Sequence, residues 1–306
     1  MDTSACAGRC KTRRPLMERG WTTRLGMAAG MVLAILLTAG CDDIANLRPT
    51  QWRRQHDSQP LGAQKELAVT TKLAAGRLTL DQADPGQLYS LDTQWDSANM
   101  TRSVQCETKG SAATLTVVIE GRTMSTEDTR MGLSLAGGLP LELRFETGAG
   151  ENQLDLTGLN VRRLVLQQGA GEVKLWADSP QAEPCQLLEA SSGVGEMQLR
   201  GLSNLAPVEI DFKGGIGHAM LDFSGEGTRN MRAHLAVGIG QIEVVLPRRL
   251  GVRLDVQGNT SGLQVSDTDF RKAGNTYTSH KYADSPQRLE LTVATGLGGA
   301  SIRFTD

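Results

Sequence analysis

Apolar and polar residues alternate around a series of small-residue bends between residues 148 and 298. Seven tripeptide bends recur at spacings of 21, 24, 22, 23, 21 and 37 residues, beginning at Gly148, Gly169, Gly193, Gly215, Gly238, Asn259 and Gly296. Three and five residues before each of these anchors the side chain is apolar, and four and six residues after them only Asn152 is polar. Alternation of this kind on both sides of a bend predicts two strands per repeat, each with one face turned inward. The pattern therefore predicts an all-β, right-handed parallel β-solenoid of about seven coils.

An N-terminal segment repeats the coil pattern. In the stretch 67–80, centred on Ala74, apolar residues flank a small-residue bend in the same way, which predicts an additional coil. Longer strands separated by turn residues follow at 87–95, 102–108 and 113–119. We expect these strands to form an antiparallel meander, so that residues 63–130 make a small N-terminal β cap and residues 131–306 make the solenoid.

The C-terminal coil is expected to be the last coil of the stack. Its outer edge would then leave backbone N–H and C=O groups without a neighbouring strand. Ile302 and Phe304 lie on this last coil. The sequence therefore predicts that this end pairs with a second copy or with an envelope protein.

The N-terminus carries an export signal. An apolar run of 12 residues, Met27 to Thr38, follows Arg19 and Arg24 and is too short for an ordinary membrane span of about 20 residues. The sequence Leu37-Thr38-Ala39-Gly40-Cys41 resembles the lipobox of a bacterial lipoprotein. The resemblance implies that residues 1–40 are a signal peptide and that Cys41 is diacylated, with an uncleaved anchor as the alternative.

This signal would place the chain in the cell envelope, facing the periplasm or the exterior. Asp42, directly after the cysteine, resembles a signal for retention in the inner membrane. Residues 41–62 are polar and aperiodic and predict a flexible tether. Translation can begin at Met1 or at Met17, and in the second case the cysteines at 6 and 10 are not part of the protein.

Charge and cysteine content narrow the possible partners. Without residues 1–40 the chain has 26 Lys/Arg against 32 Asp/Glu, a formal charge of −6, which argues against nucleic acid as a partner. Cys106 and Cys185 then remain besides Cys41. In an oxidising compartment a disulfide between them and a pair of free thiols both fit the sequence.

The coils resemble a known family. The Gly-Ala-Gly-Glu and Gly-Val-Gly-Glu bends, preceded by a segment like Leu67 to Leu80, resemble the toast-rack domains of bacterial envelope proteins. The C-terminal domain of LiaF-like regulators is related to these domains, and other relatives are labelled as adhesins. The resemblance covers residues 65–306 and implies a fold, whereas it implies no reaction and no cofactor.

Two searches for chemistry give one weak candidate. The Gly-x-Gly bends lead into strands and not helices, so they lack the helix N-terminus of a nucleotide site. Four residues before successive anchors lies an outward column whose members suit a cation site or an acid/base pair: Glu189, Asp211, His234 and Asp255. The alternative is a ladder of ion pairs in which Arg232 and Arg253 neutralise the acids.

We expect a non-catalytic, lipid-anchored binding or structural module of the envelope, acting in stress response or adhesion. The sequence shows no nucleophile–base set and no metal-ligand spacing, and no metal or cofactor is expected. The alternative is a carbohydrate-active enzyme of the β-helix type that acts on a polysaccharide. Activity that depended on Glu189 or Asp211 would favour this alternative.

Overall fold

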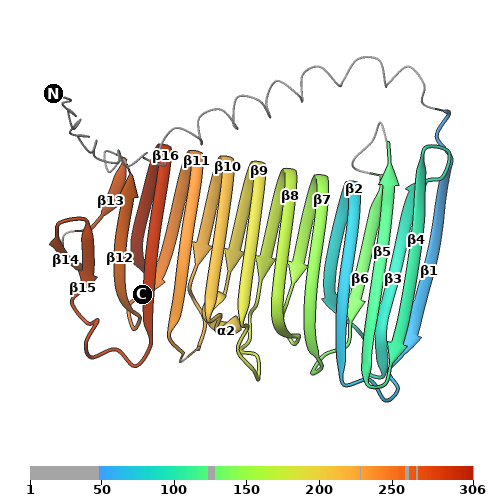
Figure 1. Ribbon diagram of the computed structural model, residues 1–306, viewed down its shortest axis with the longest axis horizontal. Helices are drawn as coiled ribbons and strands as arrows, with labels where there is room; N and C mark the ends of the chain where they lie inside the picture. The colour runs from blue at the N-terminus through green and yellow to red at the C-terminus, as the bar shows by residue number, and fades with distance from the viewer. Residues whose placement is uncertain (1–47, 123–127, 228, 259–261, 267, 306) are drawn as a thin grey trace, which may run out of the picture. The chain divides into compact units, whose positions relative to one another are not determined.

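The protein folds into one large, mixed and largely parallel β-sheet (Figure 1). The computed structural model describes residues 48–306 apart from 123–127, 228, 259–261, 267 and 306, so the predicted signal peptide, Cys41 and Asp42 lie outside the described residues. These residues form one compact unit. Its elements are β1 (Trp52–Pro60), β2 (Glu66–Gln82), β3 (Gln87–Asp96), β4 (Met100–Lys109), β5 (Ala112–Gly121), β6 (Arg130–Leu135), β7 (Pro140–Asp155), β8 (Asn160–Trp176), β9 (Leu187–Arg200), α2 (Leu202–Leu205), β10 (Glu209–Asp222), β11 (Met231–Pro247), β12 (Gly251–Gly258), β13 (Leu263–Val265), β14 (Phe270–Ala273), β15 (Thr276–Ser279) and β16 (Arg288–Thr305).

Parallel strands that each run through a glycine bend form the centre of the sheet. The order is β2-β7-β8-β9-β10-β11-β16, and the two limbs of each strand pair with the two limbs of the next one. The predicted bends align, because Gly150 pairs with Gly171, and Gly171 pairs with Gly195. Ala75 of β2 pairs with Ala149 of β7, which confirms the additional coil at Ala74.

The inward columns form one hydrophobic core. Phe145, Leu166 and Phe212 are at most 1 % exposed and belong to a single cluster that extends through both limbs of the strands. Asn152, the exception in the sequence pattern, is also buried. Its amide accepts a hydrogen bond from the hydroxyl of Thr147 at 3.0 Å and donates one to Gln168, so a polar side chain at this position is satisfied inside the core.

The order of the last two coils differs from the prediction. β16 lies between β11 and β12, so the C-terminal strand lies inside the stack and does not end it. Residues 259–261 contain no glycine, whereas an inner bend needs glycine to bring its backbone close to a neighbour on each side. The predicted free edge at Ile302 and Phe304 is therefore wrong. Ile302 pairs with Val244 and Val265, and the ring of Phe304 stacks on Phe270 at 5.2 Å.

Both ends of the stack have the same construction. At the N-terminal end, β5 and β6 run parallel to the two limbs of β2, and antiparallel β4, β3 and β1 lie outside them. At the C-terminal end, β12 and β13 run parallel to β16, and the β14–β15 hairpin covers β12. The predicted meander is thus antiparallel only in part, since β5 and β6 extend the parallel stack.

The tether predicted for residues 41–62 does not extend over all of them. Residues 52–60, read as part of a flexible segment, form β1 on the edge of β3. Most β1 side chains are exposed, so the strand carries no apolar alternation that sequence could reveal. Asp57 holds it through an ion pair with Arg102, whose side chain is 7 % exposed and also donates to Thr93 Oγ1 at 2.7 Å.

Two columns of glycine bring neighbouring bends into close contact. In one column, Gly150, Gly171 and Gly195 have φ of +134°, +124° and +136°, values that L side chains rarely adopt. A Cβ at Gly171 would also lie closer than 3.0 Å to the carbonyl oxygen of Gly150, and the same holds for Gly195 against Gly171. Backbone atoms cannot move aside without separating the strands, so glycine is required here for two independent reasons.

We expect Gly171→Ala to lower the free energy of unfolding by about 3 kcal/mol or more, because strain and a backbone clash add together. Gly138→Ala is the matched control, since Gly138 has φ +77° but nothing within 4 Å of an added Cβ. The control should lose only about 1 kcal/mol. Urea unfolding of both variants measures the difference, and equal losses would show that the close approach is unimportant.

Asp96 joins β3 to the start of the described chain and makes stability depend on pH. Its Oδ1 accepts hydrogen bonds from the backbone N–H groups of Gln51 and Ala98 at 2.9 and 3.0 Å, and its Oδ2 accepts one from Asn99 Nδ2 at 2.6 Å. Burial alone would raise the pKa of Asp96, but these hydrogen bonds outweigh burial and lower it. The stabilisation is therefore present above the unfolded pKa and is lost as pH falls through the folded value.

Asp96→Asn should lower the free energy of unfolding by about 1–3 kcal/mol at neutral pH and by less as pH falls from about 5 towards about 2. Asp81→Asn, at an exposed position of β2, is the control and should leave the neutral-pH stability nearly unchanged. Unfolding curves at several pH values test this. A gap between wild type and Asp96→Asn that did not shrink in acid would contradict the assignment.

Candidate functional site

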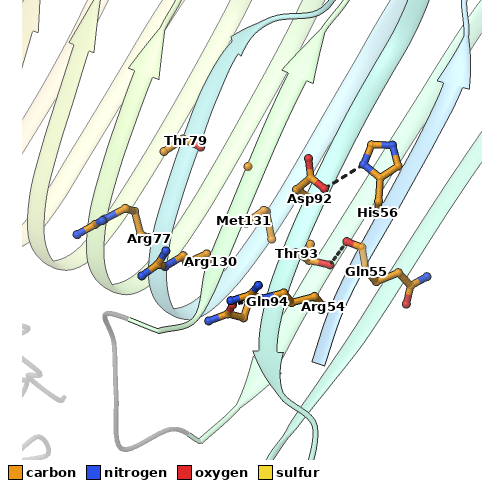
Figure 2. Close-up of a pocket in the computed structure, with 11 residues that line it drawn as sticks. Arg54, Gln55, His56, Arg77, Thr79, Asp92, Thr93, Gln94, Arg130 and Met131 are labelled. Carbon is orange, nitrogen blue, oxygen red and sulfur yellow. Dashed lines mark hydrogen bonds and ion pairs between the residues drawn. The ribbon is translucent and has the colours of Figure 1, made fainter. Parts of the chain in front are cut away.

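A cavity of about 760 Å³ opens on the outward face of the N-terminal strands. Four strands contribute to it in register, because Arg54 of β1 pairs with Gln94 of β3, Gln94 pairs with Arg130 of β6, and Arg130 pairs with Arg77 of β2. Adjacent strands are about 4.8 Å apart, so this row carries three guanidinium groups along one side of the cavity. Figure 2 shows Arg77, Arg130 and Arg54 following one another along that side.

The hollow exists because one outward position has no side chain. Two residues further along each strand, a second row contains His56, Asp92, Gly132 and Thr79. Gly132 lies between Thr79 and Asp92, and an added Cβ there would meet Thr79 Oγ1 at 3.4 Å and the Asp92 carbonyl at 3.8 Å, which are ordinary contacts. The glycine is therefore not required by the backbone at this position, and its effect is to leave the floor of the cavity open.

Hydrogen bonds and ion pairs hold the lining side chains in place. Arg54 Nε donates to Gln94 Oε1 at 2.6 Å, and Arg77 pairs with Glu151 at 2.9 Å. His56 Nδ1 lies 3.0 Å from Asp92 Oδ1, as the dashed line in Figure 2 marks. A guanidinium has five N–H donors, so arginines held by one partner keep donors for a ligand. The arrangement suits a planar anion such as a carboxylate or a phosphate.

The acidic column predicted from the sequence is only partly assembled. Glu189, Asp211 and His234 lie on neighbouring strands in register. His234 pairs next with Thr292 of β16, and Asp255 lies one strand beyond it, where it accepts a hydrogen bond from Thr276 at 2.5 Å. The insertion of β16 between β11 and β12 thus separates Asp255 from the other three residues.

An ion pair holds one member of the column, Asp211. Lys213 Nζ lies 2.7 Å from Asp211 Oδ2, and this hydrogen bond raises the pKa of Lys213. Arg232 pairs instead with Glu290 at 3.7 Å, and the guanidinium of Arg253 lies 5.2 Å from the ring centroid of Tyr282, so these two arginines have other neighbours than the predicted ladder gave them. In the described part of the chain no three His, Cys, Asp or Glu residues lie together as a metal site would need.

The two cysteines are free thiols, so the structure has no disulfide between them. Cys185 precedes β9 and is buried, which raises its pKa to about 12. Cys106 lies on β4, and β5, β2, β7 and β8 separate the two residues in the order of the sheet. Four intervening strands place them beyond the Cα separation of about 7 Å that a disulfide tolerates.

Sequence reasoning missed the arginine-lined cavity. It assigned Arg54 and His56 to a tether, and it could not pair β6 with β2 across a long insertion. The sequence did contain a signal. Polar residues occupy alternate positions at Arg54 and His56 in one segment and at Asp92 and Gln94 in another, and Gly132 interrupts a third strand. That pattern identifies outward positions, but only the register brings them together.

No helix among the described residues is long and apolar enough to cross a bilayer.

Comparisons with known proteins identify a family. The family model of the N-terminal domain of toast_rack, DUF2154, matches residues 48–200, half of the chain. A candidate cell adhesion protein from Clostridium sporogenes is similar in structure, with 15% identity and a TM-score of 0.45 over 83% of this chain and 100% of that one. A candidate adhesin from Bacteroides fragilis has 13% identity and a TM-score of 0.38 over 83% and 98%. No curated protein matches in sequence.

Proposed function

The chain belongs to the family of the toast_rack N-terminal domain, and from this premise we propose that it is a non-catalytic, lipid-anchored binding module of the bacterial envelope. Its ligand is an anionic group of an envelope component, a carboxylate or a phosphate. One observation carries the proposal, namely the row Arg54, Arg130 and Arg77 beside the hollow that Gly132 leaves open. Binding there would serve adhesion or the detection of envelope stress.

The composition of the cavity favours binding over catalysis. Of the described residues that line it, Asp92 is the one carboxylate, whereas glycoside hydrolysis ordinarily uses a pair. Asp92 is itself held by His56, and both side chains are more than half exposed. Exposed groups of this kind lack the desolvation that tunes a catalytic acid. The carbohydrate-active enzyme is therefore the weaker proposal.

The remaining chain supplies an anchor and a support. The run 27–38 and the sequence ending at Cys41 favour lipidation at that cysteine, and Asp42 favours the inner membrane. We take the parallel stack to be a right-handed β-solenoid, which holds the cavity on a rigid body. Its inner face is filled by core side chains, so ligands and partners can meet only its outward columns, ends and bends.

Lipidation predicts that Cys41→Ser moves the protein from the membrane to the soluble fraction, because the acyl chains are lost. Membrane fractionation of expressing cells, followed by detection of the protein, measures this. Cys106→Ser is the control and should leave the protein in the membrane fraction. Retention of Cys41→Ser in membranes would contradict lipid anchoring at this residue.

Binding of an anion at the cavity predicts that Gly132→Gln weakens the affinity about tenfold or more, because the new side chain fills the hollow. Oligogalacturonate, a sugar carboxylate, is the first probe, and a glycerol phosphate oligomer is the second; calorimetry measures both. Ser134→Gln is the matched control, two residues along β6 on the same face but outside the cavity. Equal affinity in Gly132→Gln and wild type would contradict the site.

A further inference from the structure

The bends carry a ridge of exposed aliphatic side chains. The middle residues of successive bends pair in register, from Ala149 and Ala170 through to Val194, Ile216, Ile239 and Leu297. The last four are large and exposed by 47 %, 43 %, 47 % and 70 %. Since neighbouring strands are about 4.8 Å apart, they form a continuous stripe, which we call the aliphatic ridge.

The surroundings of this row change along the stack. Beside Ala149 lie Glu146 and Glu151, which pair with Lys72 and Arg77. Beside Val194 and Ile216 the polar or charged residues Glu196, Lys213 and His218 remain, whereas beside Ile239 and Leu297 lie uncharged residues, namely Ala236, Gln241, Ala294 and Gly299. A contiguous row of exposed aliphatic groups, with uncharged neighbours at its Ile239 and Leu297 end, marks a surface that meets something apolar.

The chain towards Cys41 leaves at this same edge of the sheet. Register through β1, β3, β6 and β2 aligns Arg54 with Arg77, just after the bend of β2, and Trp52 lies two residues before Arg54, on the side of that bend. Trp52 is 41 % exposed. The backbone of Arg48 forms two hydrogen bonds with the side chain of Asn99, in the turn between β3 and β4. Figure 1 shows β1 starting at the edge where the strands bend. Cys41 is seven residues before Arg48, a reach of at most about 25 Å.

We propose that the edge of the sheet at which the strands bend faces the bilayer, and that the aliphatic ridge inserts into the interfacial region of the bilayer. The proposal rests on lipidation at Cys41, because the anchor would bring this edge to the lipid. Trp52 begins β1, near the other end of the sheet from Leu297, and Trp is a residue that is enriched at the membrane interface. These two contacts, together with the anchor, would hold the stack lengthwise on the membrane.

A second copy of the chain fits the ridge less well. Four partly exposed side chains offer a few hundred Å² on each copy, well below the roughly 800 Å² per partner of a stable interface. The ridge also follows a convex bend, and a convex stripe meets a matching stripe only along a line. A fluid interface adapts to such a protrusion, as it does to the apolar face of an interfacial helix.

The test places a fluorescent probe on the lipidated full chain in vesicles of phosphatidylethanolamine and phosphatidylglycerol. Leu297→Cys, in a Cys106→Ser background, carries a nitrobenzoxadiazole label, and a lipid with a doxyl group near the headgroup quenches it. Val208→Cys is the matched control. Val208 is 43 % exposed, but it lies just before the start of β10 at Glu209, away from the bend that carries Ile216. We expect quenching at Leu297 to exceed that at Val208 about twofold or more.

The outcomes separate the ridge from the anchor. Flotation with the vesicles reports the anchor, and quenching reports the ridge. Floating protein with equal quenching at both positions would overturn the ridge contact and leave the anchor intact. Energy transfer between Leu297 labels without lipid quenching would show a second copy and overturn the proposal. Failure to float would overturn both.

Discussion

The close approach of backbone to backbone at the bends is the contact on which the rest of the structure depends. The φ of Gly171 is one that only glycine adopts readily, and its Cα faces the carbonyl oxygen of Gly150 with no room for a Cβ. Because the same contact recurs from bend to bend, both limbs of every strand stay in register. Register in turn keeps residues such as Phe145 and Leu166 in one continuous core. A stack that depends on local contacts between neighbours accepts large variation in its outward columns.

The two ends of the stack solve the problem of unpaired strand edges in the same way. The first and last full strands, β2 and β16, are each flanked on their outer side by shorter parallel segments from elsewhere in the chain, which are β5 and β6 beside β2, and β12 and β13 beside β16. Antiparallel strands then lie outside the last parallel ones, as β4 does on β5 and β15 does on β12. Native sheets commonly protect exposed edges by covering them. This arrangement covers the edges of β2 and β16, so the edge predicted at Ile302 and Phe304 is not a docking surface, whereas the outward face and the bends remain exposed.

The outward positions differ in character along the stack. Arg54, Arg77 and Arg130 gather at the N-terminal end around an open floor, whereas Ile239 and Leu297 are exposed at the other end without nearby charge. Neither feature is needed for the core, which uses the inward columns alone. We regard the cavity and the ridge as two separate surfaces, one suited to anions and one to lipid. A bend edge that faces the membrane would leave the sides of the stack open to the rest of the envelope.

Periodicity by itself determined the repeat, the bends and the buried columns, because these follow from local alternation and from the conformational freedom of glycine. It predicted the position of Ala74 in a coil and the polar break at Asn152. The place of β16, the pairing of β1 and the row Arg54–Gln94–Arg130–Arg77 came only from the tertiary structure. The residues of a strand do not indicate which distant strand will pair with it. An edge strand such as β1 also has no buried face, so its sequence lacks the alternation of apolar and polar residues. The physical reason is that the residues of each strand determine which of its side chains are buried, whereas strand order depends on which whole segments pair most stably with one another.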